Sequence, residues 1–155
     1  MTLAETIKMI EVVASKQPSV NMIVRNDVFR LNAKADAKYG VFAWLQREHQ
    51  TSSDSAFIDF SFTFFFVDRL KDDKSNELEI QSTGIQTLNN IIRVLDEYDV
   101  LSDSTYTFQV FNQRFNDLCA GVYCNVTLSV PITGYCAEFF NEFSPLDFND
   151  DFLVY

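Results

Sequence analysis

The stretch from Ala56 to Leu70 constrains the fold more than any other part of the sequence. It reads AFIDFSFTFFFVDRL and holds six phenylalanines but no glycine or proline. Its even positions from Ile58 to Phe66 are apolar, whereas its odd positions change from polar at Asp59 to apolar at Phe65 and Val67. A period of two indicates a β-strand. We therefore expect one face of this strand in the core, and the apolar half of the other face must find cover elsewhere.

Length and charge exclude several classes of protein. The chain has 155 residues, which fits one domain, and a formal net charge of -10. No apolar run approaches the roughly 20 residues of a membrane helix, and the start, MTLAETIKMIEVV, carries acids where a signal peptide needs basic residues. A direct grip on nucleic acid needs clustered lysines and arginines. The sequence therefore predicts neither membrane association nor nucleic-acid binding.

Periodicity predicts the remaining elements. Thr2 and Glu5 have capping-box spacing, which predicts a first helix over about 2–16. Residues 40–49 alternate as a strand and should form a hairpin with 56–70. Ser82 is expected to cap a second helix whose inner stripe is Ile85, Leu88, Ile91, Ile92 and Leu95. Two further strands are expected over 106–110 and 122–130, the second closed by Pro131.

This order of elements predicts an α+β fold. We expect an antiparallel β-sheet of about four strands with two helices packed on one face, plus an extended C-terminal arm. Residues 1–132 would form the domain and residues 133–155 the arm. No Lys or Arg follows Arg114, so the arm is acidic, although it is also rich in aromatic residues. It can pack on its own domain or lie on a neighbouring subunit.

The residues that usually carry chemistry do not gather into a site. His49 is the single histidine, and Cys119, Cys124 and Cys136 lack CxxC spacing, so we interpret them as free thiols, with Cys124 in the core. The acids Asp72, Asp73, Glu77 and Glu79 do not have the spacing of a calcium loop, and a solvated turn is the favoured interpretation. We expect no catalytic residue, cofactor or metal, and hence no enzyme.

A resemblance supplies a more specific hypothesis. An opening helix and a long hairpin, followed by FFFVDRLKDDKSNELEIQSTGIQTLNNIIRVL, resemble the tail-terminator and tail-completion proteins of tailed bacteriophages. The segments QPSVNMIVRNDVFRLN, YGVFAWLQREHQ and FNQRFNDLCAGVY are similar to small virion proteins of crAss-like phages. The resemblance covers about residues 2–132 and contains no catalytic signature.

The resemblance implies a non-enzymatic structural protein of the virion neck or tail, assembled in the host bacterial cytoplasm. Its partners would be identical subunits in a six- or twelve-fold ring, together with the portal, adaptor and tail proteins, and DNA would pass through the lumen without specific contacts. The candidates for the subunit interface are Phe57, Phe65, Val67, Phe148, Phe152, Leu153 and Tyr155. The candidates for acids facing the DNA channel are Asp72, Asp73, Glu77 and Glu79.

The alternative hypothesis is a small α+β binding module. Such a module would use an aromatic face of the sheet to hold a peptide or an apolar ligand.

Overall fold

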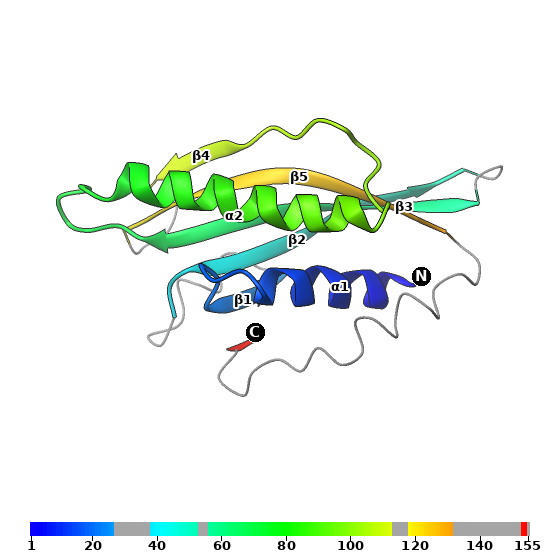
Figure 1. The fold of residues 1–155 in the computed structure, drawn as a ribbon, viewed down its shortest axis with the longest axis horizontal. Helices are drawn as coiled ribbons and strands as arrows, with labels where there is room; N and C mark the ends of the chain where they lie inside the picture. Colours follow the sequence, from blue (N-terminus) through cyan, green and yellow to red (C-terminus); the bar gives the residue numbers. More distant parts are fainter. Residues whose placement is uncertain (27–37, 53–55, 113–117, 132–152, 155) are drawn as a thin grey trace.

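The computed structural model describes residues 1–26, 38–52, 56–112, 118–131 and 153–154. Within these ranges two helices and a mixed sheet make up the fold, which is α+β as the sequence predicts (Figure 1). The elements in chain order are α1 (Leu3–Ser15), β1 (Met22–Arg25), β2 (Val41–Thr51), β3 (Phe57–Arg69), α2 (Glu77–Glu97), β4 (Gln109–Asn112), β5 (Cys119–Pro131) and β6 (Leu153–Val154).

The sheet has the strand order β4-β5-β3-β2-β1, and the two-residue β6 pairs beyond β1. The expected hairpin of β2 and β3 is present and antiparallel, and β5 pairs antiparallel with β3 along its whole length. The expectation of a purely antiparallel sheet is wrong, because β1 runs parallel to β2. Residues 22–24 are all buried, so β1 lacks the alternation that marks a strand with one solvated face.

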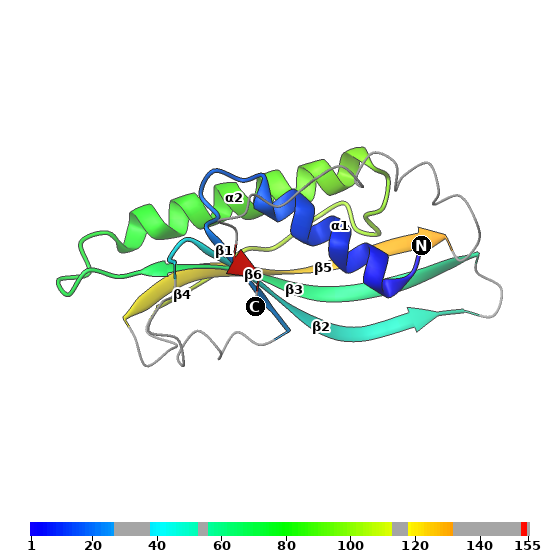
Figure 2. The same ribbon diagram turned by 90° about the horizontal axis from the view of Figure 1, so that it is seen from below.

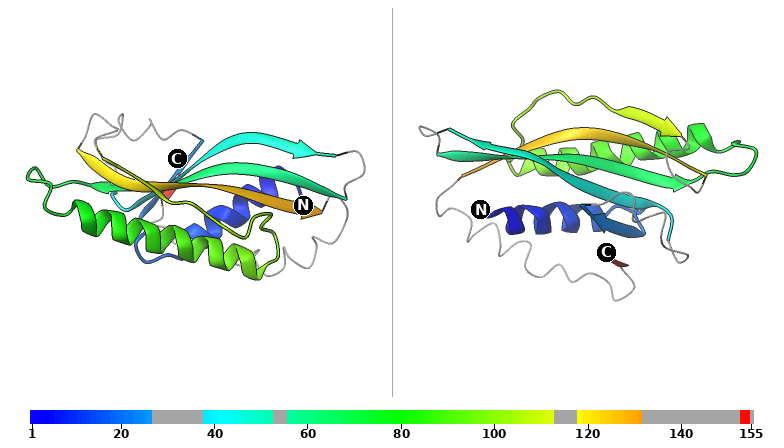
Figure 3. Two further views of the ribbon diagram at one scale, coloured as in Figure 1. Left: turned by 90° about the horizontal axis from the view of Figure 1, so that it is seen from above. Right: turned by 180° about the vertical axis from the view of Figure 1, so that it is seen from behind.

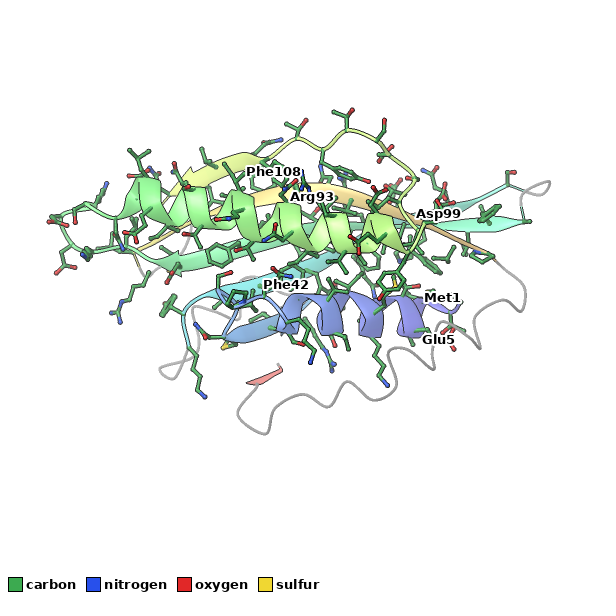
Figure 4. The ribbon with its side chains drawn as sticks, viewed as in Figure 1. Met1, Glu5, Phe42, Arg93, Asp99 and Phe108 are labelled. Carbon is green, nitrogen blue, oxygen red and sulfur yellow. The ribbon has the colours of Figure 1, made fainter. Side chains whose placement is uncertain are left out.

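Both helices lie on the same face of the sheet (Figure 2). They cover the even positions of β3, where Phe60, Phe62, Phe64 and Phe66 are buried in the main core cluster. Phe42 of β2, labelled in Figure 4, joins this row. Its ring meets that of Phe64 edge-on, with 5.3 Å between the centroids. The aromatic face of the hairpin is therefore the core of the domain, as the alternation of the sequence predicts.

A second core cluster lies on the opposite face of the sheet. Phe65 stacks on Tyr123 with 5.6 Å between the ring centroids and meets the ring of Phe111 edge-on. Phe65 is 8% exposed and Val67 is fully buried. The interface role expected for these two residues needs correction, because their own chain already shields them from water. The apolar odd half of β3 forms a second, smaller core.

The two helices differ in how well the sequence predicts them. The capping box of α1 is present, with Thr2 as the N-cap and the side chain of Glu5 accepting from the Thr2 backbone N–H. Helix α2 instead begins at Glu77 after Asn76, so the assignment of Ser82 as its cap is wrong. The inner stripe is confirmed at Leu88, Ile91, Ile92 and Leu95, but Ile85 is 39% exposed and faces outward.

Strands β4 and β5 are displaced from their expected positions. Strand β4 covers residues 109–112 instead of 106–110, while Tyr106 and Phe108 precede it and pack against the main core. Strand β5 begins at Cys119, three residues earlier than expected, and ends at Pro131 as predicted. Gly121 permits this extension, because a Cβ there would collide with the carbonyl oxygen of Phe66 on β3.

Candidate interaction surfaces

The residues most often used in catalysis lie apart in the structure. His49 is exposed on β2, and its ring meets that of Phe60 edge-on with 5.2 Å between centroids. Cys119 and Cys124 are both buried. Burial raises the pKa of the Cys124 thiol to about 12, which keeps it protonated and unreactive near neutral pH. The thiol of Cys119 donates to the hydroxyl of Tyr39, with 3.7 Å between sulfur and oxygen.

The four acids singled out in the sequence belong to one connection. Asp72 and Asp73 are exposed in the turn after β3, and Glu77 and Glu79 lie in the first turn of α2. The backbone N–H of Ser75 donates to Asp73 and lowers the pKa of that carboxyl group. Within the described ranges no three His, Cys, Asp or Glu side chains are grouped closely enough to hold a metal ion.

The carboxylate of Glu11 is buried and accepts three side-chain hydrogen bonds, and it was not identified from the sequence. The Glu11 side chain is only 2% exposed, although α1 carries it on an apolar face. Arg25 donates to both carboxylate oxygens through Nε and a terminal nitrogen at 2.6 Å each, and the indole N–H of Trp44 donates at 3.1 Å. This hydrogen bonding raises the pKa of Arg25, and the Coulombic attraction of Glu11 adds to it.

The Glu11 contact ties together three elements: α1, β1 and β2. Arg25 ends β1 and Trp44 lies opposite it on β2, so one carboxylate links the helix to both parallel strands. A signal existed in the sequence, because an acid buried among Ile10, Val12 and Val13 requires a cationic partner. The partner could not be identified, since the three residues are distant along the chain.

A β-bulge shapes the outer half of the sheet. The pairing of β2 with β3 shifts between Gln46 and His49, so an extra residue is placed on β2. The strand is exposed from Gln46 to its end. An open hollow of about 510 Å³ borders the bulge, and most of its lining is polar: Arg47, Glu48, Gln50, Ser61, Phe62, Asn125, Val126 and Thr127.

Large apolar side chains that are exposed lie at both ends of the sheet. Phe57, at the start of β3, is 49% exposed. At the other end Leu78 is 80% exposed, Ile85 39% and Val110 53%. Val110 pairs with Val122, which pairs with Phe66, nine positions along β3 from Phe57. At about 3.3 Å per residue the two regions are roughly 30 Å apart. They are therefore separate surfaces.

The interface candidates in the arm are only partly placed. Phe148, Phe152 and Tyr155 lie outside the described residues. The backbone of Leu153 belongs to β6 and pairs with Met22 of the same chain. Their interface role stays a prediction.

No protein-family model matches the sequence, and no curated protein is significantly similar to it. No helix within the described residues has the length and apolar character needed to span a membrane.

Proposed function

We propose that this chain is a non-enzymatic structural subunit of a phage virion. It would form a ring in the neck or tail, between portal and tail, that encloses the DNA channel. The resemblance of residues 2–132 to tail-terminator and tail-completion proteins motivates the proposal. The structure supplies physical support that does not depend on this resemblance.

The outer half of β2 is not covered by its own chain, although the paired residues of β3 and β5 belong to the core, and this observation carries the proposal. From Gln46 onward β2 is exposed, and Phe57 at the far end of the hairpin is half exposed. On the face away from the helices, the outer half of β3 carries the partly accessible side chains of Ser61 and Thr63. A rigid surface of this kind fits a neighbouring subunit. A contact between unlike surfaces of identical subunits closes a ring when the rotation allows it.

The charge of the chain fits a passage for DNA. The net charge of -10 repels phosphate over the distance of a Debye length. In the connection and the first turn of α2, the four acids Asp72, Asp73, Glu77 and Glu79 outnumber the two lysines of the same segment. Asp73 is exposed and ionised at neutral pH, like any aspartate with a pKa at or below its ordinary value. We place this connection at the lumen.

The ring is tested by size-exclusion chromatography with light scattering of the purified chain over a range of concentrations, and by negative-stain imaging. Phe57→Asp should weaken assembly, since it puts a charge at the exposed end of the hairpin. Ile85→Asp is the matched control: it makes the same kind of change at the opposite end of the sheet. A single-subunit mass up to about 1 mM, the weakest range of specific association, contradicts the proposal. If the two variants weaken assembly equally, the end of the hairpin is not part of the contact between subunits.

A binding module is the second candidate. A module that binds a ligand through an aromatic face of the sheet is not supported, because the two helices bury the even face of β3 and the chain itself shields Phe65. The polar hollow beside the bulge fits a hydrophilic ligand better than an apolar one.

A further inference from the structure

The side of the molecule formed by α2 and β4 combines an outermost strand with exposed apolar side chains. β4 is the last strand in the sheet order on this side, as the right panel of Figure 3 shows. Its sequence, QVFN, contains no charge and no proline, two of the usual means of blocking an edge strand, although with four residues the strand is short. Within the described residues, this edge is therefore suited to accept a further strand.

The apolar side chains lie on the helix side of this edge. Phe111 points to the second core cluster, so its neighbours Val110 and Asn112 point toward α2. The side-chain amide of Asn112 donates to Glu77 at 2.8 Å, which ties the end of β4 to the first turn of the helix. Leu78 and Ile85 are seven residues apart, about two helical turns, and share one flank of α2. A strand added beside β4 would place alternate side chains over this flank.

The other end of the same side is acidic. A hollow of about 260 Å³ lies between α2 and the segment that leads to β4, and its lining includes Arg93, Asp96, Asp103 and Tyr106. Burial, followed by the charge of Asp103 and with a smaller effect of Asp96, raises the pKa of Tyr106 to about 12. Two carboxylates and one guanidinium line the hollow, so its charged side chains are net negative. Figure 4 labels Arg93 on α2; Phe108, in the segment that leads to β4, packs against the main core.

We infer that the α2–β4 side binds an extended segment of a different protein, which adds as a strand beside β4. The segment carries apolar side chains at alternate positions over Leu78, Ile85 and Val110, and basic residues near Asp96 and Asp103. The charges exclude the arm of this chain as the occupant, because no Lys or Arg follows Arg114. If the segment runs antiparallel to β4, its basic residues lie at its C-terminal end. This inference goes beyond the ring and does not depend on it.

The test uses a labelled synthetic peptide, acetyl-Val-Thr-Val-Thr-Val-Thr-Lys-Lys-amide, of about eight residues, within the usual range of strand lengths. Its matched control has two glutamates in place of the lysines. Fluorescence anisotropy should show binding of the lysine peptide at least ~10-fold tighter than the control. The double change Asp96→Asn and Asp103→Asn should remove this preference. Val110→Lys should weaken binding of the lysine peptide by at least ~10-fold, because it puts a charge on the edge strand.

Two controls keep the test decisive. Phe57→Ala, at the opposite end of the sheet, should leave peptide affinity unchanged, and circular dichroism should show that the Val110→Lys chain keeps its fold. The inference is overturned if neither peptide binds at about 1 mM or if Val110→Lys leaves the affinity intact. It is also overturned if Val110→Lys dissociates a homodimer of the chain, since the occupant would then be a second copy.

Discussion

The buried carboxylate of Glu11 allows a sharp prediction about stability. In the variant Arg25→Met the aliphatic stem stays, while Glu11 keeps only the indole N–H of Trp44 as a partner. Removing one member of a buried ion pair costs about 3–5 kcal/mol in free energy of unfolding. We expect about 3 kcal/mol, near the lower end, because the Arg25 side chain is 51% exposed and its loss admits water to the carboxylate.

The matched variants separate charge from packing. In Glu11→Met with Arg25→Met no buried charge remains, so the double variant should recover part of the lost stability. Trp44→Phe alone removes one hydrogen bond to a charged acceptor and should cost about 1.5–3 kcal/mol. Each chain is unfolded in urea and followed by far-UV circular dichroism. For all chains except Trp44→Phe, the fluorescence of Trp44, the single tryptophan, is a second probe beside the ion pair.

Two results would refute the reasoning. A loss below about 1 kcal/mol for Arg25→Met would place this pair among ordinary surface salt bridges. A double variant less stable than Arg25→Met would mean that the side chains are held by packing and that the isolated carboxylate is not the cause.

Three other regions give further predictions. Gly84→Ala places a methyl group 2.9 Å from Val122 Cγ2, so overpacking of about 1–3 kcal/mol should exceed the helix-propensity gain of about 1 kcal/mol, as chemical denaturation would show. Because burial raises the pKa of Tyr106 to about 12, the free energy of unfolding should be unaffected by this group below pH 10 and should fall as the pH rises from 10 toward about 12. In Tyr106→Phe the fall should be smaller, and an identical pH profile would contradict the assignment. In a Cys136→Ser chain the two remaining thiols are buried, so a thiol reagent at pH 8 should label Cys124 only at the rate of opening or unfolding. Rapid labelling of the folded chain would be inconsistent with the burial described.

The hairpin could be predicted because its pattern is local. Alternation along residues 56–70 identifies both the strand and its buried face, and the turn composition before it gives the antiparallel pairing. The α1 boundary could likewise be predicted, since Thr2 and Glu5 satisfy each other within one turn. These features depend on contacts between residues close together in the sequence, so a local sequence pattern can predict them.

The errors arise where distant contacts decide. β1 is too short and too completely buried to show a period. Its parallel pairing with β2 is determined by tertiary contacts and not by the local sequence. Helix α2 begins at Glu77 after Asn76, although Ser82 is an equally favourable N-cap by residue type. The Glu11 contact depends on residues 14 and 33 positions away, so no local pattern identifies its partners. Among the candidate interface residues, Phe57 is exposed as its position suggests, whereas Phe65 is hidden by rings from other strands.

The long pairing of β3 with β5 has a mechanical consequence. The two strands are in register over every position from Phe57 to Arg69, without a bulge. A pull along the strands must shear all of these backbone hydrogen bonds together, whereas a pull across them opens the ladder one bond at a time. The molecule is therefore stiffest along its length, and a tether attached at the two ends of this pair would bear more tension than one attached across it.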